Sequence, residues 1–213
     1  MPRRKSERMG VVIRSLKDDD TLRDYRYWLS RPPEERIAAM EILRLQWHKI
    51  RNERPIPLQR DEELFELFNQ EKVKYLIIGA HALGFYGIPR LTGDIDVLVG
   101  AAASNARRVT SAVRRFGFNI KGIEEKDFMK PDAVMQLGYP PVRIDILTSI
   151  SGVDFEEAWK RRVAGKYGRI AVWFIAKEDL LTSKRAAGRK KDILDIEILS
   201  SRAKKSSPRR HRE

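Results

Sequence analysis

The chain has 213 residues and a formal net charge of +13, and 42% of its residues are hydrophobic. A chain of this length can bury one good-sized core and at most a small appendage. The sequence shows no apolar run long enough to span a bilayer and no signal peptide, so we expect no association with a membrane. It contains no cysteine, which excludes disulfides and thiolate metal sites and favours a cytoplasmic location.

The excess of positive charge is largest at the two ends of the chain. Residues 1–10 contain four basic residues and one acidic residue, a net charge of +3, and residues 202–213 contain six basic residues and one acidic residue, a net charge of +5. Such charged blocks are typical of solvated, disordered tails that aid solubility. The alternative is that they bind nucleic acid by releasing its counterions.

The first third of the chain is predicted to be mainly helical. Residues 10–16 are interpreted as a short strand or extended arm. Apolar residues then recur at helical spacing in the segments 21–30, 30–51 and 58–73. The intervening residues 52–58, which contain two prolines, are interpreted as a linker.

From residue 74 onward, short apolar runs alternate with amphipathic stretches. Strands are predicted at residues 74–79, 94–100, 133–138, 142–149 and 165–175, the last of them preceded by a turn. Helices are predicted at 80–88, at 104–118 with Ser104 as its N-cap, at 154–162, and as a pair within 177–202 that meets near Gly188. This order predicts an α/β or α+β fold in which helices flank a mixed β-sheet.

Two carboxylates begin the predicted strand DIDVLVG. Positions two apart on a strand point to one face, so Asp94 and Asp96 face the same way. Asp145 lies in a similar apolar setting in RIDILT, and if the two strands are neighbours, three carboxylates converge. Their repulsion is most commonly balanced by a divalent metal, and oxygen-only ligands favour Mg²⁺ or Mn²⁺. The alternatives are turn chemistry after Gly93 for the first pair, and an ion pair with Arg143 for Asp145.

Gly79 ends the preceding apolar strand. A glycine at this position lets backbone N–H groups and the start of the following helix approach phosphate oxygens. Two metal ions about 3.5–4 Å apart, bridged by carboxylates, suit in-line displacement at phosphorus. Asp145 could then accept the proton of the attacking hydroxyl.

The segments IIGAHALGFYGIPRLTGDIDVLV and VRIDIL resemble the nucleotidyltransferase superfamily, which includes DNA polymerase beta. GAHAL, DIDVLV and AAGRKKDILDIEIL are, more narrowly, similar to the AbiEii-like toxin nucleotidyltransferases of type IV toxin–antitoxin systems. The resemblance implies transfer of a nucleoside monophosphate from a Mg²⁺-bound nucleoside triphosphate to an acceptor hydroxyl of a tRNA, a protein or a small molecule, with an antitoxin as a possible partner. It implies a nucleotidyltransferase domain at 59–202, a basic arm and helical extension at 1–58, and a basic disordered tail at 203–213.

The resemblance also indicates residues that contact the nucleotide. The toxins carry a lysine and an arginine near the nucleotide on a late helix, and the candidates here are Lys184 and Arg189; the alternative is an amphipathic helix with a wet basic face. Arg90 and Thr92, just before the aspartates, could contact the triphosphate or belong to a solvated loop. Asp192 and Asp195 are expected to pair with neighbouring bases rather than bind metal, and His81 is expected to be a packing or capping residue.

One position departs from the pattern of the superfamily. The usual serine or second glycine after Gly79 is Ala80, so phosphate binding there would rely on backbone N–H groups alone. This departure leaves open a catalytically degenerate protein of the same fold, which would act as a nucleic-acid-binding or partner-binding module.

Overall fold

The computed structural model describes residues 21–50, 59–117, 123–138 and 143–200. The predicted arm at 10–16, the linker at 52–58, the turn that joins the strands near residue 140, and both basic ends lie outside the described residues. None of the helices in the described part combines the length and the apolar character needed to cross a membrane.

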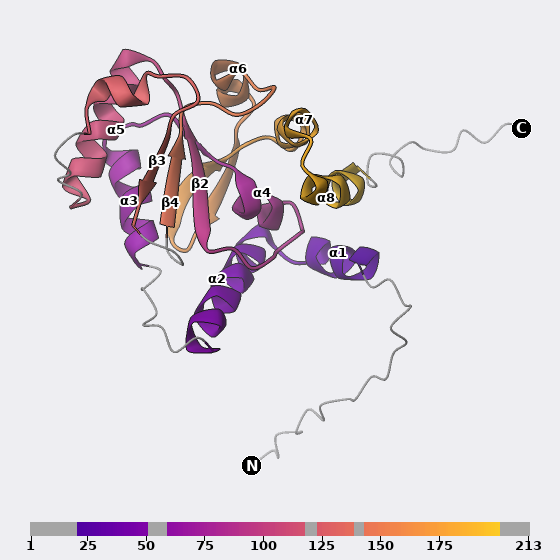
Figure 1. Ribbon diagram of the computed structural model, residues 1–213. Helices are drawn as coiled ribbons and strands as arrows, with labels where there is room; N and C mark the ends of the chain where they lie inside the picture. The colour runs from indigo at the N-terminus through magenta and orange to yellow at the C-terminus, as the bar shows by residue number, and fades with distance from the viewer. Residues whose placement is uncertain (1–20, 51–58, 118–122, 139–142, 201–213) are drawn as a thin grey trace, which may run out of the picture.

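A six-stranded mixed sheet forms the centre of the molecule (Figure 1), which confirms the predicted α/β (α+β) fold class. The strands lie in the order β3-β4-β2-β1-β6-β5. Neighbours are parallel in the pairs β2–β4 and β1–β6 and antiparallel in the other three pairs. The strands are β1 (Tyr75–Ile77), β2 (Asp94–Val99), β3 (Val134–Leu137), β4 (Arg143–Leu147), β5 (Val163–Tyr167) and β6 (Ile170–Phe174).

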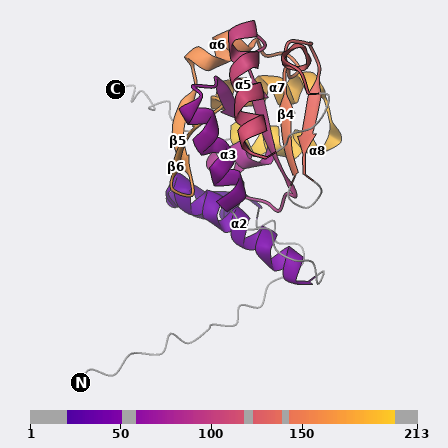
Figure 2. The same cartoon turned by 90° about the vertical axis from the view of Figure 1, so that its left-hand side faces the viewer.

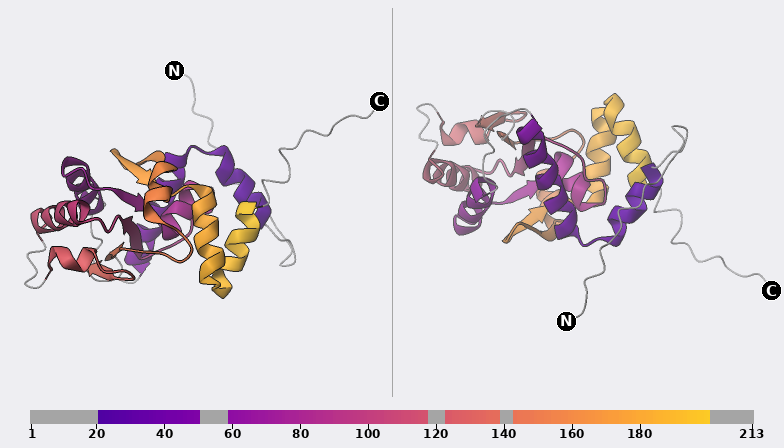
Figure 3. Two further views of the ribbon diagram at one scale, coloured as in Figure 1. Left: turned by 90° about the horizontal axis from the view of Figure 1, so that it is seen from above. Right: turned by 90° about the horizontal axis from the view of Figure 1, so that it is seen from below.

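Helices cover both faces of this sheet. Those of the described residues are α1 (Thr21–Ser30), α2 (Pro33–Ile50), α3 (Gln59–Gln70), α4 (Gly79–Phe85), α5 (Ala103–Arg115), a 3₁₀ turn (Glu125–Phe128), α6 (Phe155–Lys160), α7 (Lys177–Ala187) and α8 (Lys190–Ser200). Helices α3 and α5 lie on one face, and α4, α7 and α8 lie on the other (Figures 1 and 2). The last two form an antiparallel pair (Figure 3), joined at Gly188, whose φ of 61° ends α7.

Two details differ from the prediction. The turn and strand predicted within 165–175 are present as a turn at 168–169 and strand β6, but strand β5, which pairs with β6 in a hairpin, was not predicted because its sequence VAGKY lacks an apolar alternation. Gly165 is needed within it, because a Cβ there would lie 2.7 Å from the ring of Phe85 and 2.8 Å from that of Phe174. Helix α5 begins at Ala103, with Ala102 rather than Ser104 in the N-cap position and no side-chain cap.

Helix α2 shares the hydrophobic core of the residues that follow it. Ile37 and Met40 are 2% exposed and belong to the same buried cluster as the sheet residues. Next to them, the Arg44 guanidinium pairs with Glu41 at 2.7 Å and with Asp61 of α3 at 2.9 Å. Helix α2 is thus fixed both by apolar packing in the common core and by a buried ion pair with α3.

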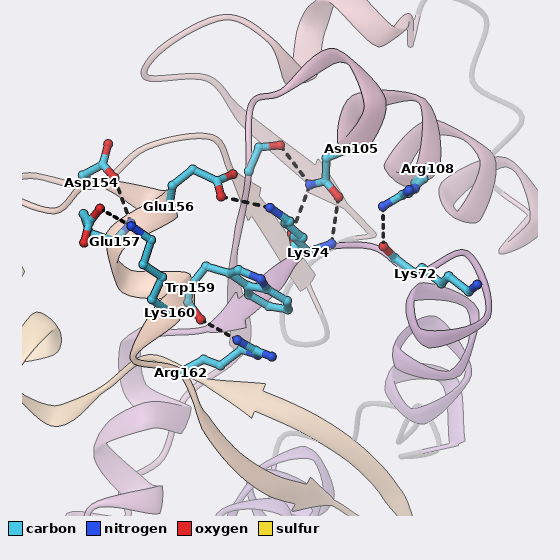
Figure 4. A network of polar contacts seen from close by, with 11 residues as sticks. Lys72, Lys74, Asn105, Arg108, Asp154, Glu156, Glu157, Trp159, Lys160 and Arg162 are labelled. Carbon is cyan, nitrogen blue, oxygen red and sulfur yellow. Dashed lines mark hydrogen bonds and ion pairs between the residues drawn. The ribbon is translucent and has the colours of Figure 1, made fainter.

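A side-chain network on the α5 side fixes the ends of β1 and β2 (Figure 4). The Asn105 amide donates to the carbonyl oxygens of Lys74 at 3.0 Å and Gly100 at 2.9 Å, and its oxygen accepts from the Lys74 N–H at 2.7 Å. These bonds hold the antiparallel register in which Ile77 is opposite Val97. Because these bonds set the register at the Lys74 end of β1, they also set where the Ile77 end of β1 lies relative to β2.

Candidate active site

The two aspartate-bearing strands are adjacent in the sheet, as the sequence predicts. β2 and β4 pair in parallel, with Asp94 beside Arg143 and Asp96 directly beside Asp145. Adjacent residues of paired strands project to the same face, so all three carboxylates lie on one side of the sheet. This is the side covered by α4, α7 and α8 (Figure 1).

Gly79 brings the backbone of the β1–α4 junction against this carboxylate cluster. Its φ is +62°, and an added Cβ would lie 1.9 Å from Asp96 Oδ2. The Ile78 N–H donates to the Asp96 carbonyl oxygen at 3.0 Å, which holds the two segments together. Only glycine therefore fits here while the Asp96 carboxylate keeps its place.

The carboxylates of Asp94 and Asp145 are joined by one guanidinium. Arg143 Nε donates to Asp145 Oδ1 at 2.6 Å, and its Nη2 donates to Asp145 Oδ2 at 2.9 Å and to Asp94 Oδ2 at 3.0 Å. The ion pair considered as the alternative for Asp145 is thus present, and it extends to the second strand. Thr92 Oγ1 donates to Asp94 Oδ1 at 2.7 Å.

Asp96 accepts no side-chain hydrogen bond from the described residues. Burial, together with the negative charges of Asp94 and Asp145, raises the pKa of its carboxyl from 3.8 to about 6, while His81 and Lys191 act in the opposite direction. A carboxyl that is hard to ionise beside two others marks a site where negative charge is in excess.

The donor set suits a hard divalent cation. Three carboxylates face one guanidinium, and carboxylate oxygens are the ligands that Mg²⁺ and Mn²⁺ prefer. As the side chains stand, no group of three His, Cys, Asp or Glu residues among the described residues is arranged to hold a metal ion. Asp94, Asp96 and Asp145 supply the oxygen donors that such a cation prefers, but Arg143 now bonds both oxygens of Asp145 and Oδ2 of Asp94.

Two connected hollows open from Asp96. We name the first the loop arm; it measures about 360 Å³ and is lined by Gly79, Ala80, Arg90, Leu91, Thr92, Asp94, Asp96, Lys184, Arg189, Lys191 and Asp192. We name the second the α7 arm; it measures about 310 Å³ and adds mainly apolar and serine side chains, among them Ile78, Leu147, Ile150, Leu180, Ser149 and Ser183. The arms share Gly79, Asp96, Lys184, Arg189 and Asp192. A cleft with one basic arm and one partly apolar arm suits a ligand that is itself part anionic and part apolar.

The basic residues of the loop arm differ in how far their charge is already neutralised. Lys184 is buried and its Nζ bonds Asp192 at 2.6 Å and Asp195 at 2.8 Å, so these aspartates pair with a base as expected. Arg90 bonds Asp195 at 3.1 Å. Arg189 and Lys191 line the arm with no ion pair to other described residues.

Lys191 faces the carboxylate cluster closely enough to lower the pKa of Asp96. The sequence indicated Lys191 only as a neighbour of Arg189, within the run RKK. Its place at the start of α8 is the signal that could have singled it out, because the first turn of that helix faces the site.

His81 lies beneath the site rather than in it. It is 1% exposed, and its Nε2 lies 3.4 Å from Glu41 Oε1 of α2. Tyr167 donates to the same Glu41 oxygen at 2.6 Å. His81 is thus a packing residue, as expected, and it connects α4 to the buried charge cluster that holds α2.

Comparison with known proteins gives a family for most of the chain. A family model described as "Nucleotidyltransferase of unknown function (DUF6036)" matches residues 58–202. No curated protein matches the chain. The matched range contains the sheet, the carboxylate cluster and both arms of the cleft.

Proposed function

The chain belongs to this family of nucleotidyltransferases of unknown function, and from that premise we propose that it transfers a nucleoside monophosphate from a nucleoside triphosphate to an acceptor hydroxyl, releasing pyrophosphate. The observation that carries the proposal is the pairing of Asp96 with Asp145 on adjacent parallel strands, with the Gly79 backbone against the Asp96 carboxylate.

In this proposal Asp94, Asp96 and Asp145 hold Mg²⁺ or Mn²⁺. The cation, when bound, supplies a Lewis acid that activates the attacking hydroxyl and neutralises charge on the triphosphate. Asp145 sits beside the attacking group and accepts its proton. Thr92 fixes the Asp94 carboxylate through the 2.7 Å bond to Oδ1, which leaves Oδ2 directed toward Arg143 and the cluster.

The loop arm is the proposed place of the triphosphate. Gly79 and Ala80 offer backbone to phosphate oxygens, and Arg189 and Lys191 offer positive charge that no described carboxylate neutralises. Such charge stabilises the negative charge that develops on the leaving pyrophosphate. Lys184 and Arg90 contribute by holding α8 in place, because both pair with Asp195.

The finer assignment follows the resemblance to AbiEii-like toxins. We propose a tRNA or protein acceptor and a toxin role, with an antitoxin as the partner that restrains it. The net charge of +13 supports an RNA acceptor, since a basic chain attracts a polyanion.

Incubation with each α-labelled nucleoside triphosphate, Mg²⁺, and either total RNA or cell lysate tests the proposal. We expect label on RNA or on a protein, and we expect Asp96→Asn and chelation of the metal each to abolish it. The matched control is Asp179→Asn. Asp179 pairs with Arg161 at a distance of 2.8 Å and lines neither arm of the cleft, so the variant should leave the transfer intact. Absence of any label transfer with all four nucleotides and both acceptor pools would favour the catalytically degenerate module.

A further inference from the structure

The Arg143 guanidinium is the only cation within hydrogen-bonding distance of the three-aspartate cluster among the described residues. It donates to both oxygens of Asp145 and to Oδ2 of Asp94, so it bridges β4 and β2. The pairing register makes this possible, because Arg143 lies directly opposite Asp94 and two residues before Asp145.

The bonds to Arg143 use the same oxygens that a divalent cation would use. A guanidinium and a metal ion repel each other, so a metal ion at Asp94 Oδ2 and the Asp145 carboxylate weakens the bonds of these oxygens to Arg143. In the described residues no group of three possible ligands is arranged for a metal, although three carboxylates share the site. Arg143 lies between Asp94 and Asp145 in that arrangement and bonds both carboxylates.

Arg143 is less confined than the buried cations Lys184 and Arg44, and more confined than Arg90 of the loop arm, whose side chain is 35% exposed. The Arg143 side chain is 25% exposed, whereas that of Lys184 is 10% exposed and that of Arg44 is 4% exposed. An exposed guanidinium can exchange a carboxylate partner for water at small cost, whereas a buried one cannot. Of the two partly exposed cations, Arg143 is the one that bonds the aspartate cluster, because Arg90 bonds Asp195 instead.

We infer that Arg143 is an exchangeable counter-ion of the Asp94–Asp96–Asp145 cluster. In the metal-free protein it balances part of the cluster's charge through Asp94 and Asp145, and it leaves these two carboxylates when a divalent cation binds. This inference rests on the proposed function, because that function supplies the cation. The affinity for the metal is consequently lower than it would be for the three carboxylates without Arg143, because displacing the guanidinium costs free energy.

Titration of Mn²⁺ alone into the full-length protein, followed by calorimetry, tests the inference without any turnover. We expect Arg143→Met to bind Mn²⁺ at least about tenfold more tightly than the unaltered protein, since a like charge near the ion is removed. Arg143→Lys keeps one positive charge but cannot donate to both carboxylates, and its affinity should fall between the two. The matched control is Arg161→Met, which removes a guanidinium that makes a similar two-bond contact with Asp179. This variant should bind Mn²⁺ with the affinity of the unaltered protein.

Thermal unfolding separates the inferred role from a purely structural one. With a chelator present, Arg143→Met should unfold at a lower temperature than the unaltered protein, because the cluster then lacks its counter-ion. With saturating Mn²⁺ the deficit should disappear. An equal deficit in both conditions would show a structural residue and overturn the inference.

The outcomes of the Mn²⁺ titration distinguish this inference from the proposed function. If Mn²⁺ binds both proteins equally, or binds Arg143→Met more weakly, and Asp96→Asn abolishes binding, the inference is overturned while the metal site of the proposed function stands. If Mn²⁺ binds neither the unaltered protein nor any variant, the inference and the metal site of the proposed function are both overturned. If Mn²⁺ binding rises in Arg143→Met and Arg143→Lys and is lost in Asp96→Asn, both are supported.

Discussion

At the scale of single residues, Asp96 differs from its two neighbours because no guanidinium or hydroxyl of the described residues donates a hydrogen bond to its carboxylate. Burial and the charges of Asp94 and Asp145 raise the pKa of its carboxyl to about 6. The unfolded chain ionises this group near pH 3.8, so ionised Asp96 destabilises the metal-free fold. That destabilisation is fully present above pH 6, decreases as the pH falls, and is absent below pH 3.8.

Asp96→Asn should therefore stabilise the metal-free protein, and the stabilisation should increase with pH between about 3.8 and 6. At pH 8 in the presence of a chelator, we expect its free energy of unfolding to exceed that of the unaltered protein by about 2–3 kcal/mol. At pH 4.5 the difference should shrink to about 1 kcal/mol. Urea unfolding at the two pH values measures both numbers, and an Asp96→Asn protein that is less stable at pH 8 would contradict the account.

The residues of the site were predictable from sequence to different degrees. Alternation in DIDVLV and RIDIL was enough to predict that the aspartates share a face, because strand periodicity is local. The bond from Arg143 to Asp94 depends on the register of two strands separated by almost fifty residues, which alternation does not specify. That Asp192 and Asp195 pair with bases was predictable from the sequence, but the burial of Lys184 depends on how α7 and α8 pack and is visible only in the structure.

At the scale of elements, the junction of β1 and α4 is where strand, helix and site meet. Gly79→Ala would put a Cβ 1.9 Å from Asp96 Oδ2 in a backbone conformation with φ of +62°. We expect the variant to lose nucleotidyl transfer and at least about 1 kcal/mol of stability, because the carboxylate must move and the backbone is strained. Gly117→Ala is the matched control, since its φ is +94° but nothing lies within 4 Å of the added Cβ.

A Gly117→Ala protein should thus show the stability loss due to backbone strain without the loss of transfer. Equal activity of the two alanine variants would show that the position of the Asp96 carboxylate against Gly79 does not matter for function. Circular dichroism melts and the label-transfer assay, run on the same preparations, measure the two effects.

Helix α2 is held by a buried charge cluster as well as by apolar contacts. Arg44 pairs with Glu41 and Asp61, and all three side chains are at most 8% exposed. Although burial opposes ionisation of Glu41, the hydrogen bond from His81 and the charge of Arg44 hold the pKa of Glu41 below its usual value. Removing the guanidinium leaves two buried carboxylates without a cation.

Arg44→Met should lower the free energy of unfolding by about 3–5 kcal/mol. Arg161→Met removes an arginine that is half exposed and paired with Asp179, and should cost about 1 kcal/mol or less. Urea unfolding compares the two. Similar losses in both variants would mean that burial of the Arg44 cluster does not decide how strongly α2 is held.

Element prediction succeeded where the periodicity was strong and failed where tertiary contacts decide. Helices α7 and α8 and the break at Gly188 follow from the apolar spacing and from a glycine that adopts a positive φ. Strand β5 does not, because VAGKY is held by pairing with β6 and by rings packed on Gly165 rather than by its own pattern. The contact of α2 with the common core was equally beyond a local pattern, since it depends on Met40 meeting α4 at Gly84.

At the scale of the whole molecule, charge is the property that bears on partners. The chain carries a net charge of +13, and residues 203–213 contribute five basic residues against one acidic residue. If RNA is the acceptor, replacing those five basic residues with serine should weaken RNA binding and reduce the slope of log affinity against log salt concentration. Filter binding at several salt concentrations measures the slope, and an unchanged slope would show that the basic end takes no part in binding.

The central claim is that aspartates from two adjacent strands jointly bind the cation used in nucleotidyl transfer. Anomalous diffraction from crystals soaked in Mn²⁺ and an α,β-methylene nucleoside triphosphate locates that cation directly. We predict a peak about 2.0–2.3 Å from oxygens of Asp94, Asp96 and Asp145, with the Arg143 guanidinium withdrawn from Asp94. A bound Mn²⁺–nucleotide with its metal away from Asp96 and Asp145 would contradict the account.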